Sequence, residues 1–361
     1  MARSQRAKRG ATVTLDVSGV KDAPDEVGTG HLLSARGLRA AYAGRTRDTV
    51  AVDDVSLYVN DGEVLGIAGE SGCGKSTLAA VLSLTARPPL NVLGGELDVA
   101  GKRLSFEPDK APPRSWRGTV VSLLPQGAMN SLSPTMRVGD FAVRIVAAHE
   151  GKVKRTDALA RAAERFTQLD LPDRVLQAYP HQLSGGMKQR VVTVLSTLLD
   201  PQLLIADEPT SALDVSSQRV VIELLREMIN QRLVGGVIFV THDLPVLRLV
   251  ADRVAIMYAG QIHETGPTED VINRARHPYT GALLRSVLVP EPQIRTRRIA
   301  GITGSPPDLA APPPGCRFHP RCSLAMDVCH TEQPPIVGDE RHYATCWWAK
   351  DHPGEPVEAH L

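Results

Sequence analysis

Short apolar runs, each followed at once by polar residues, are the clearest pattern along the chain. Four of them are four or five residues long and almost wholly apolar, at 64–68, 120–124, 203–206 and 237–240. Runs of this length and composition are typical of strands buried in a parallel sheet. Because ligands of such sheets bind beyond the carboxyl ends of the strands, we expect the four following loops to converge on one site.

Other short strands flank these four and indicate a second layer. Residues 32–38 and 50–59 have strand patterns, a hairpin joins 96–99 to 102–104, and another hairpin is expected over 253–262. These segments follow one another without intervening helices, which is typical of antiparallel pairing. The sequence therefore predicts an α/β fold with a parallel core sheet and an antiparallel β subdomain.

Between 127 and 200 the strand pattern gives way to helical spacing. Charged residues occupy one face of the predicted helix, at Arg161, Glu164 and Arg165. Apolar residues recur on the other face, at Leu159, Ala162, Ala163, Phe166 and Leu169. This amphipathic pattern predicts an inserted helical subdomain over about 127–200.

Composition and charge narrow the class of protein. The 361 residues include 41 basic and 40 acidic side chains, so no overall positive field marks a nucleic-acid binder. No apolar run approaches the ~18 residues that a membrane-spanning helix needs. Residues 1–29 are basic but contain no apolar stretch, so they predict a disordered tail and not a secretory signal.

The composition changes again after residue 288. Residues 289–315 are rich in proline and arginine, which predicts a linker. Four of the five cysteines then fall within 316–346, and such clustering favours a local metal or cluster site over a scattered disulfide framework. We therefore predict a main domain over 30–288, a cysteine-containing extension over 289–350 and a tail over 351–361.

The sequence GESGCGKST at 69–77 lies between a predicted strand and a predicted helix. This is the context of a P-loop, in which glycines let backbone N–H groups and a helix N-terminus face phosphate groups. Lys75 would reach the β- and γ-phosphates, and the Ser76 hydroxyl would ligate Mg²⁺. The residues expected to contact a nucleotide here are Gly69, Ser71, Gly72, Gly74, Lys75, Ser76 and Thr77.

Two acidic residues directly follow the apolar run at 203–206, in the pattern called Walker B. Asp207 emerges from a buried strand and is placed to hold Mg²⁺ through its water shell. Glu208 comes next and is placed to orient and polarise an attacking water.

A third motif, LSGGM at 183–187, opens another predicted helix. Ser184 fits the N-cap position, and Gly185 and Gly186 leave the first turn without side chains. A bare helix N-terminus of this kind attracts anions.

With these motifs in this order, residues 31–288 resemble the nucleotide-binding subunit of an ATP-binding-cassette transporter. On this resemblance Gln126 matches the Q-loop, Asp214 ends the D-loop, and His242 matches the switch histidine. The resemblance implies a P-loop NTPase fold and hydrolysis of ATP with Mg²⁺, in which Glu208, His242 and Gln126 are catalytic.

The resemblance also assigns the remaining contacts of the site. Mg²⁺ would be held by Ser76, Gln126 and Asp207, and Tyr42 would stack on adenine. A head-to-tail pair of such subunits is implied. Ser184, Gly185 and Gly186 of one subunit would cap the γ-phosphate bound by the other, with Asp214 nearby.

A narrower resemblance, to oligopeptide/dipeptide importers, lies in the segments 276–284 and 315–322. In that subfamily the tail cysteines resemble ligands of a [4Fe–4S] cluster, here Cys316, Cys322, Cys329 and Cys346. The residues alone leave zinc, an iron–sulfur cluster or metal-free thiols open. Their gaps of five, six and sixteen residues lack the C-x₂-C pairs of structural zinc, which favours iron–sulfur.

Our hypothesis from the sequence is an ATPase subunit that energises import of peptides at the cytoplasmic face of the membrane. The partners implied are a second cassette subunit, commonly a paralogue, two permease subunits and an extracytoplasmic solute-binding protein. Alternatives are an importer of nickel or another solute, a regulatory cassette without hydrolysis, and a soluble cassette protein acting on nucleic acid. The balanced charge, the single cassette and the presence of both Glu208 and His242 disfavour the last two.

Overall fold

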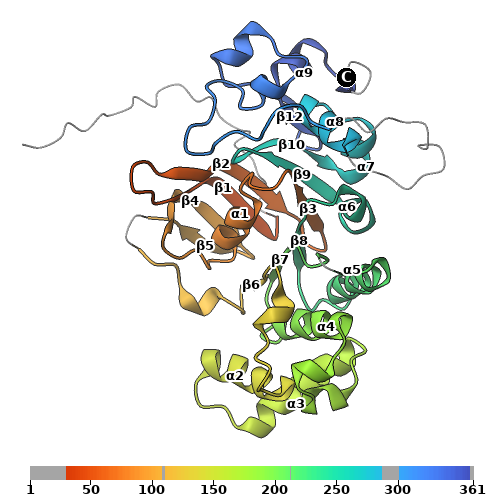
Figure 1. The fold of residues 1–361 in the computed structure, drawn as a ribbon. Helices are drawn as coiled ribbons and strands as arrows, with labels where there is room; N and C mark the ends of the chain where they lie inside the picture. The colour runs from red at the N-terminus through yellow and green to blue at the C-terminus, as the bar shows by residue number, and fades with distance from the viewer. Residues whose placement is uncertain (1–29, 108–109, 212, 287–300, 358–361) are drawn as a thin grey trace, which may run out of the picture.

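The computed structural model describes residues 30–107, 110–211, 213–286 and 301–357. The tail predicted at 1–29 and the first part of the predicted linker lie outside these residues. The described chain forms two sheets with helices around them (Figure 1). The larger sheet has the strand order β11-β12-β10-β9-β3-β8-β7-β6, and the smaller has β2-β1-β4-β5.

Five neighbouring strands of the larger sheet are parallel: β6 (Val121–Leu124), β7 (Leu203–Asp207), β8 (Gly236–Val240), β3 (Val64–Ala68) and β9 (Arg253–Tyr258). Four of them were predicted as such. The fifth, β9, was predicted only as part of a hairpin, and it also makes that hairpin with β10 (Gln261–Pro267).

The core strands are buried on both faces, which explains their apolar sequences. Along β3, Leu65 and Ile67 pack on one side of the sheet, and Val64 and Ala68 pack on the other. The first side is covered by the antiparallel sheet and α1 (Lys75–Leu82). The second is covered by α5 (Val215–Asn230), α6 (Leu244–Val250) and the helices between β6 and β7.

The antiparallel sheet contains β1 (Leu33–Tyr42), β2 (Thr49–Val59), β4 (Leu90–Val99) and β5 (Lys102–Ser105). β1 and β4 are longer than predicted because irregularities in their register let the strands continue past Gly37 in β1 and past Gly94 and Gly95 in β4. Gly95 adopts φ 113°, and a Cβ there would lie 2.8 Å from the Gly37 carbonyl oxygen. This close approach is open only to glycine.

All regular elements between β6 and β7 are helical, and they lie at the bottom of Figure 1. They are η2 (Ala128–Ser131), α2 (Val138–Glu150), α3 (Arg155–Gln168), η3 (Asp173–Gln177), η4 (Pro180–Gln182) and α4 (Gly185–Ser196). One prediction is wrong here: Arg165 was placed on the solvent face of α3, but it is only 8% exposed. Its guanidinium pairs with Asp200 and donates to the Thr197 carbonyl, so it joins α3 to the segment after α4.

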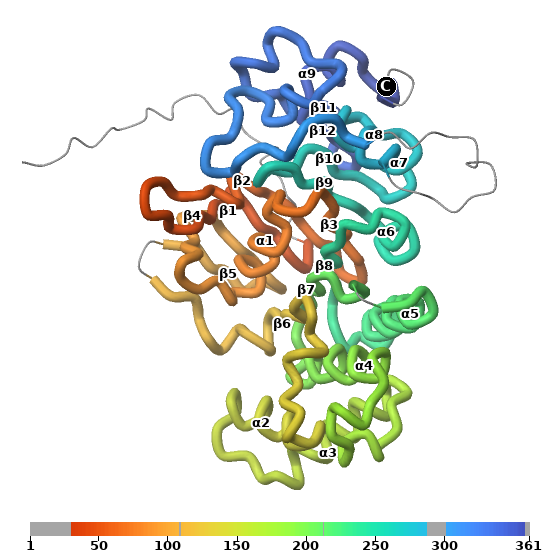
Figure 2. Tube along the Cα trace, in the orientation of Figure 1, coloured from red at the N-terminus to blue at the C-terminus, as the bar shows by residue number. Residues whose placement is uncertain are grey.

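The C-terminal extension continues the large sheet. Its strands β11 (Ile336–Gly338) and β12 (Tyr343–Thr345) add to the free edge of β10. Glu264 of β10 is fully buried and accepts a hydrogen bond from His342 Nε2 at 2.8 Å. Figure 2 shows the extension above β10 and descending toward β2. The helices α7 (Thr268–Asn273) and α8 (Pro278–Arg285) precede the extension. The remaining helical elements, after residue 288, are η6 (His319–Arg321), η7 (Asp327–His330) and α9 (Trp347–Asp351).

The predicted α/β fold, with its parallel core sheet, antiparallel β layer and inserted helices, is therefore present. Among the described residues, no helix is long and apolar enough to cross a membrane.

Candidate active site

The loop between β3 and α1 has a backbone that only glycine permits at two positions. Gly74 adopts φ 108°, and a Cβ there would lie 2.1 Å from the Ala51 carbonyl oxygen. A Cβ on Gly69 would lie 2.1 Å from the Met257 carbonyl oxygen. Neighbouring backbone therefore packs directly against the loop and fixes its path, while Ser71 and Gly72 remain exposed.

Lys75, the first residue of α1, is almost fully buried inside this loop. Its Nζ donates to the carbonyl oxygens of Gly69, at 2.7 Å, and Glu70, at 2.9 Å. The loop thus holds a cation among backbone groups at a helix N-terminus, an arrangement suited to binding phosphate.

Ser76 and Asp207, two of the three residues predicted to hold Mg²⁺, are in contact. Ser76 Oγ donates to Asp207 Oδ1 at 3.2 Å. Asp207 ends β7 and is only 6% exposed, and this burial raises the pKa of its carboxyl group, although the Ser76 hydrogen bond and Lys75 oppose the shift. A hydroxyl and a carboxylate fit Mg²⁺, which prefers oxygen ligands and would compensate the buried charge.

Three loops bring Gln126, Glu208 and His242 together. Gln126 Nε2 donates to Glu208 Oε2 at 2.9 Å, and His242 Nδ1 lies 2.9 Å from Glu208 Oε1. These residues follow the ends of β6, β7 and β8, so the strand ends converge as expected. This bond uses the amide nitrogen of Gln126, whereas the predicted Mg²⁺ contact would use its amide oxygen.

Glu208 has a backbone conformation that is unusual for a residue with a side chain. Its φ is 48°, in the left-handed region. The Glu208 N–H donates to the Val240 carbonyl oxygen at 2.8 Å, and the Ser211 hydroxyl donates to the Glu208 carbonyl oxygen at 2.8 Å. The surrounding structure thus holds the strained backbone that directs the carboxylate toward Gln126 and His242.

Tyr42 lies at the end of β1, beside α1. Its hydroxyl is 3.1 Å from Thr77 Oγ1, and the residue is 38% exposed. Tyr42 lies beyond the strand predicted at 32–38, but the structure extends β1 to include it, next to the P-loop helix. Its ring is therefore accessible to a flat ligand there.

The LSGGM motif begins the helix α4, as predicted. This helix does not adjoin the P-loop of the same chain. Ser184 caps α4 by accepting from the Met187 N–H at 3.3 Å, and Gly185 is exposed. A Cβ on Gly186 would lie 3.2 Å from the Ser217 hydroxyl of α5. In Figure 1, α4 lies below the sheet and apart from α1, so one chain does not bring this motif to its own P-loop.

Asp214 caps the neighbouring helix α5. Its carboxylate accepts from the Ser217 N–H at 2.8 Å and from the Ser216 hydroxyl. These hydrogen bonds, the one from Ser216 first, lower the pKa of Asp214. An ionised side chain at this exposed helix N-terminus is also favoured by the helix dipole.

Two residues that the sequence did not assign also contact the P-loop. Tyr279 of α8 accepts a hydrogen bond from the Glu70 N–H at 2.8 Å, and Arg321 of the extension pairs with the Glu70 carboxylate at 2.6 Å. Both lie in segments that carry the narrower resemblance. The sequence signal that could have indicated such a contact is Glu70 itself. A carboxylate inside a phosphate-binding loop is expected to need a nearby cation that neutralises it.

The four cysteines predicted to hold an iron–sulfur cluster are free thiols. Burial is the main cause that raises the pKa of Cys316 to about 11 and the pKa values of Cys322 and Cys346 to about 12. Neighbouring thiols contribute to the increase to a smaller extent. Thiols are suitable donors for such a cluster when ionised. In the part of the chain that the structure describes, however, no group of three or more His, Cys, Asp or Glu is arranged to hold a metal ion. The structure does not support this prediction.

Comparison with known families agrees with the motifs. The family model described as ABC transporter matches residues 52–211, and the model described as oligopeptide/dipeptide transporter, C-terminal region, matches residues 263–329. A dimeric bacterial ABC transporter cassette and a dimeric post-hydrolysis cassette bound to ADP and Pi share the fold. Each has a TM-score of 0.55, at 24% and 23% identity, and covers 65% of this chain and 98% of the solved chain.

Curated relatives match nearly the whole chain. The dipeptide transport ATP-binding protein of Caldanaerobacter subterraneus is 38% identical over 326 residues, 89% of this chain and 98% of that protein. The oligopeptide transport ATP-binding protein of Bacillus subtilis is 38% identical over 329 residues, 90% of each. The chain therefore belongs to the ABC transporter family, among the ATP-binding proteins that carry the oligopeptide/dipeptide transporter C-terminal region.

Proposed function

We propose that this chain hydrolyses ATP to energise the import of oligopeptides or dipeptides through a membrane complex. The observation that supports the enzymatic part is the group formed by Gln126, Glu208 and His242, which adjoins the P-loop and Asp207. The names of the relatives, dipeptide and oligopeptide transport ATP-binding proteins, support the cargo.

In this proposal the P-loop N–H groups and Lys75 bind the β- and γ-phosphates, and Tyr42 stacks on adenine. Ser76 and Asp207 would hold Mg²⁺, which neutralises charge on the phosphates when bound. Glu208 orients the attacking water and accepts its proton. His242 holds the Glu208 carboxylate in place, and Gln126 bonds its other oxygen.

The other half of the site comes, we propose, from a second cassette subunit. Within one chain the first turn of α4, with Ser184, Gly185 and Gly186, lies away from the P-loop. Its exposed N-terminus suits a γ-phosphate bound by a partner, and Asp214 caps the adjacent helix. The partner is proposed to be a paralogue in a head-to-tail pair. Two permease subunits and an extracytoplasmic solute-binding protein would complete a transporter, with this chain on its cytoplasmic face.

The complex provides the test of this function. We expect a tag on this chain to recover a second cassette subunit and two membrane-spanning subunits from detergent extracts. Reconstituted in vesicles with its solute-binding protein, the complex should accumulate labelled peptides only when ATP is supplied. Uptake of Ni²⁺ without peptide uptake would favour the alternative cargo. ATP hydrolysis stimulated by nucleic acid, with no membrane partner, would contradict the proposal.

We propose separately that Cys316, Cys322, Cys329 and Cys346 hold an iron–sulfur cluster, on which no step of ATP hydrolysis depends. Its support is that the thiols of Cys316 and Cys329 are near enough to Cys322 to contribute, after burial, to its raised pKa. Anaerobically purified chain is expected to contain iron and acid-labile sulfide, and Cys322→Ser to lose them. Protein that contains zinc, or neither iron nor sulfide, would contradict this proposal.

A further inference from the structure

The carboxylate of Glu70, in the P-loop, is bonded by an arginine from the far C-terminal part of the chain. Arg321 Nη1 donates to Glu70 Oε2 at 2.6 Å, and Nη2 donates to Oε1 at 3.0 Å. This is a bidentate pair, the geometry in which an arginine and a carboxylate interact most strongly. It joins residues 251 positions apart in the sequence.

Arg321 is held in this position by its other bonds. Its side chain is 5% exposed, its Nε donates to the Thr303 carbonyl oxygen at 2.8 Å, and Nη1 also donates to the Tyr258 hydroxyl at 3.3 Å. The hydrogen bonds to Glu70 are the main reason that the pKa of Arg321 is raised. The guanidinium is thus a positive charge held in a fixed position against the Glu70 side chain of the P-loop.

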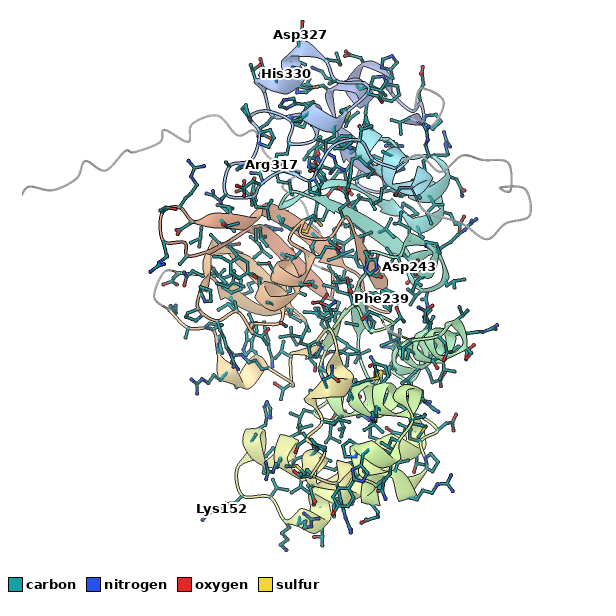
Figure 3. All side chains as sticks on the ribbon, in the orientation of Figure 1. Lys152, Phe239, Asp243, Arg317, Asp327 and His330 are labelled. Atoms are coloured by element: carbon teal, nitrogen blue, oxygen red, sulfur yellow. The ribbon has the colours of Figure 1, made fainter. Side chains whose placement is uncertain are left out.

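The backbone of Glu70 is fixed as well. Its N–H donates to the hydroxyl of Tyr279, a fully buried residue, and its carbonyl oxygen accepts from Lys75 Nζ. Arg321 and Tyr279, which lie outside the P-loop, therefore hold Glu70 in place, and Lys75 is bonded to the Glu70 carbonyl oxygen. Arg317, labelled in Figure 3, anchors the same part of the extension by pairing with Asp53 of β2 and donating to the Ala259 carbonyl.

The charge of Glu70 gives this contact a consequence for ligand binding. A carboxylate in a loop that binds phosphates would repel them, and low solvent exposure would strengthen the repulsion. The bidentate pair with Arg321 cancels that charge. We propose that Arg321 is a positioning residue for the nucleotide, which acts through Glu70 by neutralising its carboxylate and fixing the P-loop backbone. This inference rests on the proposed binding of ATP at the P-loop.

Binding of Mg-ATP to the full-length chain, measured by calorimetry, tests the inference. We expect Arg321→Met to raise the Kd about tenfold, because Glu70 is left charged and unpaired beside the phosphates. Glu70→Gln alone should bind at least as tightly as the wild type. The double variant should return to within about threefold of the wild-type Kd, since the repelling charge is gone.

Two further variants separate this electrostatic role from a structural one. Arg321→Lys keeps the charge but loses the fork, so it should restore most of the affinity. Arg253→Met removes an arginine that pairs with Glu63 at 2.9 Å, at the opposite end of β3. That variant should lose thermal stability, as we also expect of Arg321→Met, but keep the wild-type Kd.

Kinetics of the membrane complex give a second readout. Arg321→Met should raise KM for ATP about tenfold while kcat changes less than about twofold, because the groups around Glu208 are untouched. A wild-type Kd for Arg321→Met, or a double variant that binds no better than Arg321→Met, would overturn the inference. A wild-type chain that binds no ATP would instead overturn the proposed function.

Discussion

Replacing Glu208 by glutamine is expected to lower kcat for ATP hydrolysis by about 10²–10⁴-fold, the contribution of a well-placed general base. Glutamine is nearly isosteric and can still bond Gln126 and His242, but it cannot accept a proton from water. ATP binding should be retained, because Lys75, Ser76 and Asp207 are unchanged. Hydrolysis is measured as phosphate release by the complex, and binding by calorimetry.

Glu223→Gln serves as the matched control for this prediction. Glu223 lies on α5, is exposed, and pairs with Arg219 at 2.9 Å on the same helix. The same chemical change there should leave both hydrolysis and binding within about twofold of the wild type, because exposed pairs of this kind contribute little. Wild-type turnover in Glu208→Gln would remove Glu208 from the catalytic role.

The sheet and the convergence of its loops were predictable because the signals are local. A buried strand must be apolar on both faces, and the polar residues that follow it must lie beyond its carboxyl end. The sequence at 203–208 therefore indicates by itself a strand that leads into Asp207 and Glu208. The position of His242 after β8 follows from the same reasoning. What the pattern did not reveal is that Glu208 bonds both Gln126 and His242 directly, from a left-handed backbone.

Predictions failed where distant residues change the environment of a position. Arg165 has the spacing of a solvent-facing residue on α3, yet Asp200 and the Thr197 carbonyl supply partners that make its burial possible. Helical periodicity reports one face of one helix and contains no information about such partners. Tyr42 lies beyond the strand predicted at 32–38 for a related reason, because pairing with both β2 and β4 extends β1 to this residue.

The extension predicted over 289–350 contacts the cassette at both the core sheet and the P-loop. It adds β11 and β12 to the core sheet and sends Arg321 to the P-loop. Pairing between residues so far apart in sequence leaves no local pattern. The sequence distinguishes the short segments containing Tyr279 and Arg321 only by their resemblance to oligopeptide/dipeptide importers, and the fold shows that both residues contact Glu70.

Replacing Lys75 by alanine is expected to weaken binding of Mg-ATP to the full-length chain about 10–100-fold, the loss expected for a charged hydrogen-bonding group. Lys75 Nζ sits inside the loop, bonded to the Gly69 and Glu70 carbonyl oxygens. When nucleotide binds, the Lys75 ammonium group would bond phosphate oxygens. Alanine has no charged group that could make these bonds. Calorimetry gives the affinity, and hydrolysis by the complex should fall with it.

A lysine elsewhere tests whether the effect belongs to the P-loop. Lys102 of β5 is exposed, and Lys102→Ala should bind ATP as the wild type does. Because Lys75 is buried, thermal unfolding of Lys75→Ala must be compared with that of the wild type, and Lys75→Met provides a variant that keeps the packing of the stem. If folded Lys75→Met binds Mg-ATP with the wild-type Kd, the assignment of residues 69–77 as the phosphate-binding loop is wrong.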